Sequence, residues 1–369
     1  MKRVVVSGGG TGGHIFPALA VIESLKKMQP DLEVLYIGSQ EGMEARIVPE
    51  QGVLFQGVKA RKLRKLISFS TPAAGAALAQ GFLEARRYMR AFGAEAVLGT
   101  GGYVAAAAAL AGVSLGLPLV ICAPDAIPGR TNRLLARFAR TICVAFEDTQ
   151  CFFAADRVCV TGLPLRTGVC APQEVTQAGA RTRLGLHPDR FTLFAGGGSQ
   201  GAQALNGALL EALPALLEGG VQVLHQTGAR NQEEILKQTA RLRSTKAYLP
   251  MGFLNTEQMS LAHRAADLAW CRGGISTLSE ALVNKLPALV TPLPTAYADH
   301  QTANARQLER AGAVCLLAEA NLGGGRPLAE LQRLQNNEDL LVCMRNAAEA
   351  LARPNAADSV AELLLNTLQ

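Results

Sequence analysis

The sequence predicts an α/β protein made of two doubly wound parallel-sheet domains, and three observations lead to this prediction. A β-branched run at 4–7 is followed at once by a glycine-rich loop at 8–13 and then by a helical pattern. Strand-like runs alternate with helical stretches as far as residue 160. From residue 191 the same plan of strand, glycine loop and helix starts again. Alternation at this spacing is typical of parallel sheets with helices on both faces.

Length and composition agree with a two-domain globular protein. A chain of 369 residues is too long for one ordinary core, and 49% hydrophobic with 18% charged residues is typical of a folded protein. The net charge of +6 suits an anionic substrate or an anionic membrane surface. It is spread too thinly for a nucleic-acid partner, and the aromatic residues (5%) are not interleaved with basic ones. We therefore expect no nucleic acid among the partners.

The first domain is expected to span residues 1–162. Its strands are expected at 4–7, 32–37, 96–98, 117–121, 141–145 and 158–160. The helix before the third of these strands has a core-facing stripe formed by Leu78, Phe82, Ala85, Met89 and Phe92. The apolar stretch 104–121 is long enough to raise the question of a membrane span, but glycines and Pro118 interrupt it. A buried helix followed by a core strand explains it better.

The second domain is expected to span residues 163–354, after a hinge at 161–164. Residues 165–190 are polar and basic without strong periodicity. A strand at 191–195, a glycine loop at 196–201 and a helix at 202–217 then repeat the opening plan. The remaining strands are expected at 221–226, 247–249, 268–271, 288–291 and 314–317. Residues 338–369 predict helices interrupted at Pro354, and we expect the last helix, at 355–369, to pack back on the first domain.

The cysteines and histidines give further expectations. The eight cysteines include no C-x-x-C pair. Four of them lie in or beside apolar runs, as buried free thiols do: Cys122, Cys143, Cys159 and Cys271. No signal peptide is expected, because Met1-Lys2-Arg3 leads straight into a strand. Both features indicate a reducing cytoplasm. Among the histidines, His187 and His263 are expected at the surface, whereas His225 suits either the core or the wall of a site.

The first glycine loop contains G-x-G-x-x-G as Gly8, Gly10 and Gly13. A dinucleotide site also needs an acidic residue at the end of the second strand, which here ends in Gly38-Ser39, so a dehydrogenase is disfavoured. The chain has no P-loop motif, no D-x-D and no His or Cys cluster at metal-ligand spacing, so we expect neither a metal nor another cofactor. His14 is the only titratable side chain in this loop. It lies where the helix starts and faces whatever the loop holds, unless it is incidental.

Two later clusters are candidates for ligand recognition. In the stretch 271–280 a strand ends at Cys271, glycines turn the chain, and a helix begins near Ser276. Glu280 lies one turn into that helix, where it could grip a ribose diol while N–H groups of the turn meet phosphate. The alternative is a helix-start carboxylate that complements the helix dipole. The polar stretch 299–304 suits hydroxyl recognition, or is an exposed helix cap.

These motifs together resemble the MurG family. The resemblance rests on residues 9–17, 197–201, 271–280 and 299–304, and it runs over nearly the whole chain in order and at matching spacing. Members of this family transfer N-acetylglucosamine from UDP-N-acetylglucosamine to lipid I, the undecaprenyl-linked muramyl-pentapeptide, and form lipid II. The resemblance implies a GT-B fold, in which two Rossmann-like domains face each other across a cleft. It also implies inversion at the sugar carbon without a metal.

The resemblance also assigns roles to residues. Thr11, Gly12 and Gly13 would hold the diphosphate and the acceptor side of the site, and His14 would be the general base for the acceptor hydroxyl. The residues that would contact the donor, or match family positions near it, are Arg166, Ser199, Leu254, Ile275, Ser276, Thr277, Leu278, Ser279, Glu280 and Gln301. Within that set, 275–280 would hold the uridine and ribose, Gln301 would read the donor sugar, and Leu254 would lie near the uracil.

One segment departs from the family pattern. Where the family usually has His-Glu-Gln-Asn, this chain has Cys122-Ala123-Pro124-Asp125. Asp125 can accept a hydrogen bond from a sugar hydroxyl, but it cannot donate as an asparagine does. A related transferase with another UDP-sugar or lipid acceptor is therefore an alternative. A catalytically weak sugar-nucleotide-binding scaffold of the cell-wall machinery is another, although the retained His14, Glu280 and Gln301 argue against it.

The segment 59–69 combines basic and apolar side chains. Each basic group near an anionic surface contributes about 1 kcal/mol, and inserted apolar side chains add to this. We therefore expect peripheral, reversible binding to the cytoplasmic face of the cell membrane, where cell-wall synthesis proteins are further candidate partners. A solvated basic loop is the alternative.

Overall fold

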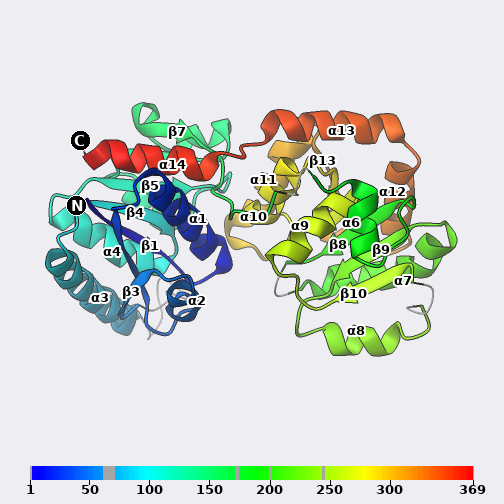
Figure 1. Ribbon diagram of the computed structural model, residues 1–369, viewed down its shortest axis with the longest axis horizontal. Helices are drawn as coiled ribbons and strands as arrows, with labels where there is room; N and C mark the ends of the chain where they lie inside the picture. The colour runs from blue at the N-terminus through cyan, green and yellow to red at the C-terminus, as the bar shows by residue number, and fades with distance from the viewer. Residues whose placement is uncertain (1, 61–70, 171–173, 199–200, 243–245, 369) are drawn as a thin grey trace. The chain divides into compact units, whose positions relative to one another are not determined.

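The computed structural model describes residues 2–60, 71–170, 174–198, 201–242 and 246–368. The chain divides into two compact units (Figure 1). The first unit comprises Met1–Arg166 together with Asn355–Gln369, and the second comprises Thr167–Pro354. Each unit is built around one parallel sheet covered by helices, which is the predicted fold class.

The first unit contains a seven-stranded parallel sheet in the order β3-β2-β1-β4-β5-β6-β7. Its strands are β1 (Arg3–Gly8), β2 (Glu33–Ser39), β3 (Leu54–Val58), β4 (Ala96–Gly101), β5 (Leu119–Ala123), β6 (Thr141–Val144) and β7 (Val158–Val160). Its helices are α1 (Gly12–Met28), α2 (Glu44–Glu50), α3 (Thr71–Phe92), α4 (Tyr103–Ser114), α5 (Arg130–Leu135) and α14 (Ala356–Leu365). The strand order reverses between β1 and β4, and the carboxyl ends of parallel strands at such a point are the usual place for a ligand.

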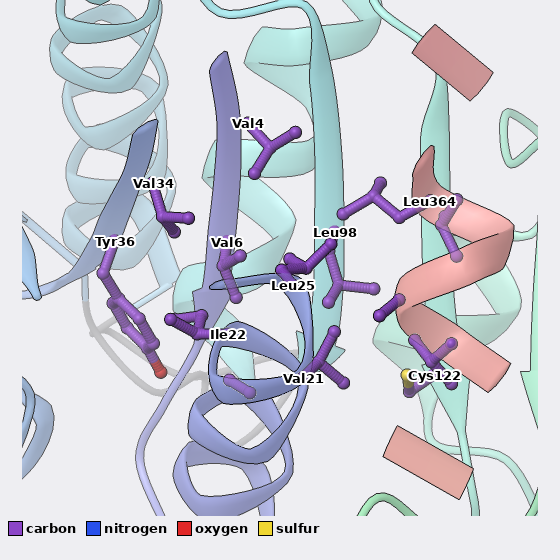
Figure 2. Packing of buried hydrophobic residues seen from close by; sticks show 14 of the residues in the cluster. Val4, Val6, Val21, Ile22, Leu25, Val34, Tyr36, Leu98, Cys122 and Leu364 are labelled. Carbon is purple, nitrogen blue, oxygen red and sulfur yellow. The ribbon is translucent and has the colours of Figure 1, made fainter. Parts of the chain in front are cut away.

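Both faces of this sheet are buried, because alternate residues of each strand point to opposite sides. Val5, Val97 and Ile121 pack against α3 and α4. On the other face, α1 and α14 together cover the sheet, and Figure 2 shows Leu98 between Leu25 of α1 and Leu364 of α14. Helix α14 therefore completes the core of the first unit although the whole second unit precedes it in the chain.

The second unit contains a six-stranded parallel sheet in the order β10-β9-β8-β11-β12-β13. Its strands are β8 (Thr192–Gly196), β9 (Gln222–Gln226), β10 (Tyr248–Met251), β11 (Leu268–Cys271), β12 (Ala288–Val290) and β13 (Val314–Leu316). Its helices are α6 (Gln177–Arg183), α7 (Gln203–Glu218), α8 (Gln232–Gln238), α9 (Thr256–Ala265), α10 (Ile275–Val283), α11 (His300–Arg310), α12 (Arg326–Gln335) and α13 (Glu338–Leu351). The single tryptophan, Trp270, is fully buried in this core.

Most of the expected elements are present, and the sequence missed several short ones. Residues 104–121 form the expected buried helix and core strand, α4 and β5. Among the described residues, no helix is long and apolar enough to cross a membrane. The stretch 165–190 contains a helix, α6, that weak periodicity did not reveal. Thr176 caps this helix, and the buried Arg181 ties it to Asp267 at 2.6 Å.

The expectation that His263 lies at the surface is wrong. Its side chain is buried in α9, where Phe194 packs edge-on against the ring and the Asn284 side-chain N–H donates to Nδ1 at 3.3 Å. His225 is also a core residue: Nε2 donates to Asn206 at 3.1 Å and Nδ1 accepts from the Tyr248 hydroxyl at 2.8 Å. Both rings are thus held in the neutral form. The exposed His187 is at the surface as expected.

The two buried histidines make the second unit sensitive to acid. Burial lowers the pKa of His225 and of His263 to about 4, below the value of about 6.5 in an unfolded chain. As the pH falls from about 6.5 towards 4, the unfolded chain binds protons that the folded unit rejects, so stability falls. We expect a loss on the order of 1 kcal/mol or more for each histidine between about pH 7 and pH 5.

Urea unfolding followed by Trp270 fluorescence measures this loss, because the tryptophan lies in the second unit. A His263→Gln variant should be less stable at neutral pH but should show a smaller difference between the two pH values. His187→Gln is the matched control and should behave like the parent protein. An equal pH dependence in all three proteins would contradict the prediction.

Candidate active site

The first glycine loop lies between β1 and α1 at the carboxyl end of the sheet. Gly10 has a φ of +83°, a conformation that favours glycine. A side chain at Gly8 would overlap Thr100, so the loop packs directly on the carboxyl end of β4. Thr11 is the N-cap of α1, and its side chain makes no capping hydrogen bond. The N–H groups at the start of α1 are therefore without a side-chain cap, an arrangement that suits an anionic ligand.

His14 lies in the first turn of α1, and its ring is held by the loop itself. Its Nδ1 lies 3.1 Å from the carbonyl oxygen of Gly9 and 3.2 Å from the hydroxyl of Thr11. A carbonyl only accepts, so Nδ1 carries the proton and, in the neutral ring, Nε2 carries the lone pair. The Thr100 hydroxyl fixes the backbone by donating to the His14 carbonyl at 2.7 Å.

The glycine-rich residues 99–102, at the carboxyl end of β4, form the surface against which the His14 ring packs. Gly101 has a φ of +109°, and a Cβ there would come within 2.7 Å of Cδ2 and 3.0 Å of Nε2 of His14. Its neighbour Gly102 has a φ of +86°, and a Cβ there would overlap the carbonyl of Gly9. A larger residue at Gly101 would displace the histidine, and one at Gly102 would displace the Gly9 carbonyl to which the ring is bonded. The two glycine turns thus form one structure around His14.

Arg166 lies beside this structure, about 150 residues further along the chain. Its guanidinium stacks on the ring of Phe16 in α1, with 4.1 Å between Cζ and the ring centroid. Phe16 in turn packs against Gly12. The structure therefore brings Thr11, Gly12, Gly13, His14 and Arg166 into one part of the first unit.

The segment that departs from the family pattern lies at the end of β5. Asp125 is half-buried there. The buried Asn132 in α5 donates to the carbonyl of Cys122 at 3.0 Å and so fixes the segment from below. Its side-chain oxygen, Oδ1, is buried without a hydrogen-bond partner. The departure therefore begins within the buried strand β5 and is hydrogen-bonded to α5.

In the second unit the clusters 271–280 and 299–304 meet. The carbonyl of Gly273 accepts a hydrogen bond from the buried Asn304 at 3.2 Å. A side chain at Gly273 would overlap the backbone of Gln301. The Gln301 side chain accepts from the N–H of Leu293 at 3.0 Å, which leaves its amide nitrogen as the group that could donate to a ligand. Just before Gln301, Ala298 and Asp299 have positive φ values of 49° and 53°, a strained conformation for such residues.

Helix α10 presents a polar side and a buried side. Ile275, Leu278 and Ser279 are buried, so contacts with a ligand from this set would come mainly from the backbone. Ser276, Thr277 and Glu280 are half-buried. Gly274 is the N-cap and offers no side-chain cap to the first N–H groups. Glu280 is the sixth residue of α10 and lies beyond its first turn, where the interaction with the helix dipole fades.

For the two remaining candidates, Ser199 and Leu254, the structure gives less detail. Ser199, in the second glycine loop, lies outside the described residues, whereas Gly198 and Gly201 on either side have φ values of 79° and 75°. Leu254 is buried ahead of α9. Among the described residues no group of three His, Cys, Asp or Glu side chains could hold a metal ion.

The sequence did not predict a role for two buried charged residues, Arg272 in the cluster 271–280 and Glu44 beside the first glycine loop. Arg272 donates to the carbonyls of Thr291 and Pro292 at 3.2 and 3.3 Å and pairs with Glu319 at 2.5 Å, so it fixes the segment that leads to α11. Glu44 accepts from the N–H of Gly10 at 3.3 Å. Nothing in the sequence pattern marks Glu44, because α2 has only seven residues and was not expected.

Comparisons with known proteins agree with this arrangement. The glycosyltransferase family 28 N-terminal domain matches residues 4–144, and the corresponding C-terminal domain matches residues 192–360. The chain is similar to two proteins named UDP-N-acetylglucosamine–N-acetylmuramyl-(pentapeptide) pyrophosphoryl-undecaprenol N-acetylglucosamine transferase. The one from Desulforudis audaxviator is 36% identical over 98% of this chain and 97% of its own. The one from Salinibacter ruber is 38% identical over 98% and 96%.

A solved structure shows the same similarity. The crystal structure of MurG from Acinetobacter baumannii has 31% sequence identity and a TM-score of 0.79, and the match covers 99% of this chain and 100% of that one. The expected fold class, the GT-B fold with its two Rossmann-like parallel-sheet domains, is confirmed. On these similarities, which extend over nearly its full length, the chain belongs to the MurG family of UDP-N-acetylglucosamine-dependent glycosyltransferases.

Proposed function

We propose that this protein transfers N-acetylglucosamine from UDP-N-acetylglucosamine to the 4-hydroxyl of the muramyl sugar of lipid I and so forms lipid II. The transfer inverts the anomeric carbon and needs no metal. The relatives' names support the donor and the acceptor. The geometry of His14 carries the catalytic part of the proposal, because the ring is held with Nδ1 protonated and Nε2 as the proton acceptor.

In this mechanism His14 takes the proton of the acceptor hydroxyl as its oxygen attacks the anomeric carbon. The bond from that carbon to the UDP oxygen breaks as the new glycosidic bond forms, and attack from the opposite face inverts the carbon. In the second unit, N–H groups at the start of α10 stabilise the diphosphate charge. Glu280 binds the ribose hydroxyls, and the Gln301 amide donates to the sugar.

The direct test is release of UDP when the protein is mixed with UDP-N-acetylglucosamine and a lipid I analogue. We expect UDP and a disaccharide product in equal amounts, and no UDP release without the acceptor. UDP binding without product would favour the scaffold alternative. The half-buried Asp125 favours a second candidate, a different lipid acceptor. Product formed only with a lipid acceptor other than the lipid I analogue would support that candidate.

We also propose that the protein binds reversibly to the cytoplasmic face of the membrane through the segment 59–69. Residues 61–70 lie outside the described part of the chain, so this proposal rests on the sequence. Replacing both Ile67 and Phe69 with Asp should abolish flotation with anionic vesicles, because it removes apolar anchors and adds negative charge. Leu54→Asp with Val342→Asp adds the same charges at two exposed apolar positions elsewhere and should leave flotation unchanged. Retained flotation of the first variant would contradict the proposal.

A further inference from the structure

Glu44 is a fully buried carboxylate at the start of α2. One oxygen accepts from the N–H of Ser39 at the end of β2, at 3.0 Å. The other accepts from the N–H of Gly10 in the first glycine loop, at 3.3 Å. Burying a carboxylate is costly unless hydrogen bonds compensate. Packing alone therefore does not explain why a glutamate occupies this buried position.

The surrounding backbone is shaped to admit this carboxylate. Side chains at Gly9, Gly38 or Gly42 would all collide with atoms of Glu44. These three glycines come from the first loop, from β2 and from the turn before α2. Three separate segments therefore lack side chains where the Glu44 side chain lies.

The carboxylate and the catalytic imidazole bind opposite ends of one peptide group. The N–H of Gly10 and the carbonyl of Gly9 belong to the same peptide bond. Glu44 accepts from that N–H, and Nδ1 of His14 donates to that carbonyl. A negative charge at the N–H end polarises the peptide group and makes its carbonyl a stronger acceptor.

We propose that Glu44 is a positioning residue for His14 and acts through the Gly9–Gly10 peptide group. This inference rests on the proposed role of His14 as the general base. The polarised carbonyl favours the ring form with Nδ1 protonated, which keeps Nε2 as the acceptor for the substrate proton. It also stabilises the imidazolium that forms when His14 takes that proton, as a carboxylate in direct contact with a catalytic histidine does.

The other ionisable groups that the structure places around this loop act differently. Tyr36 donates to the carbonyl of Gly8 at 2.6 Å, and burial followed by the charge of Glu44 raises its pKa, so it stays neutral. The ring of Tyr103 lies against Gly10. Arg166 is a positive charge stacked on Phe16 of the same helix as His14. Glu44 is a negative charge that the described hydrogen bonds link to His14 through the Gly9–Gly10 peptide group, so its removal should be felt at His14.

The test compares Glu44→Gln with Glu50→Gln, which removes the same charge from an exposed position on the same helix. Titration of ¹³C- and ¹⁵N-labelled histidine by NMR, with the His14 signal assigned from a His14→Gln spectrum, gives the pKa of His14 in each protein. We expect Glu44→Gln to lower that pKa by about 0.5 to 1 unit, less than for a carboxylate in direct contact. Glu50→Gln should leave it unchanged.

The kinetic result should show the same contrast. Glu44→Gln should lower kcat about tenfold, the lower end of the effect of losing a group that orients a functional histidine without touching the ligand. The donor KM should be unchanged, and the acid limb of the pH profile should move to lower pH. A folded Glu44→Gln variant whose His14 pKa matches the parent would overturn the proposal. The NMR result does not depend on turnover, so a failure of the proposed transfer reaction would be seen separately.

The parent protein supplies a measurement that does not require the variant to fold. The ¹⁵N shifts of the neutral imidazole report which nitrogen carries the proton. The proposal requires it on Nδ1. A His14 ring protonated on Nε2 would overturn the proposal whatever the variants show.

Discussion

Replacing His14 with alanine is expected to lower kcat by about 10²–10⁴-fold, the usual effect of losing a general base. The ring is held by the Gly9 carbonyl and by Gly101, so that Nε2 is the proton acceptor. Activity of the parent should fall on acidification, because a charged imidazole cannot take a proton. Steady-state kinetics with both substrates saturating measures the effect.

Two controls separate this role from simpler ones. His187→Ala removes an exposed histidine of the second unit and should keep full activity. If His14 only positions the acceptor or a phosphate, KM would rise while kcat stays within a few-fold of the parent. That outcome would exclude His14 as the general base.

Replacing Glu280 with alanine is expected to raise the donor KM about tenfold or more. The change removes two charge-assisted hydrogen bonds to the ribose, each worth about 1.5–3 kcal/mol before solvent compensation. Calorimetric titration with UDP should show the same loss of affinity, because UDP contains the ribose and the N-acetylglucosamine is not involved.

The matched control for this variant is Glu257→Ala. Glu257 lies in the first turn of α9 and is exposed, so its loss measures what a helix-start carboxylate contributes to stability. We expect Glu257→Ala to lower stability slightly and to leave UDP affinity unchanged. If Glu280→Ala leaves UDP affinity unchanged, the Glu280 carboxylate stabilises the helix and does not bind the ribose.

The parts of the fold that could be predicted are those with strong local patterns. Buried strands such as β1 and β8 are continuous apolar runs, and glycine turns follow them directly. The strand β3 and the helices α2 and α6 were missed because each has only five to seven residues. Such short elements are stabilised by tertiary contacts, and no local period reveals them.

The same limit applies to the candidate site. His14, Glu280 and Gln301 were found because they lie in or just after glycine turns or polar stretches that interrupt an apolar pattern. Glu44 could not be found, because its importance comes from a hydrogen bond to a loop 34 residues earlier. His263 was misplaced because its polar neighbours suggested an exposed helix, whereas Phe194 and Asn284 enclose the ring.

The position of α14 has a consequence for how the protein folds during synthesis. Val360, Ala361 and Leu364 belong to the core of the first unit, yet they leave the ribosome after all of the second unit. Domains usually fold in the order in which they are made. Here the sheet of the first unit keeps part of its surface exposed until α14 has been made. The second unit can complete its own core before that. The unit that is translated first is therefore the one that is finished last, and in that interval it depends on protection from aggregation.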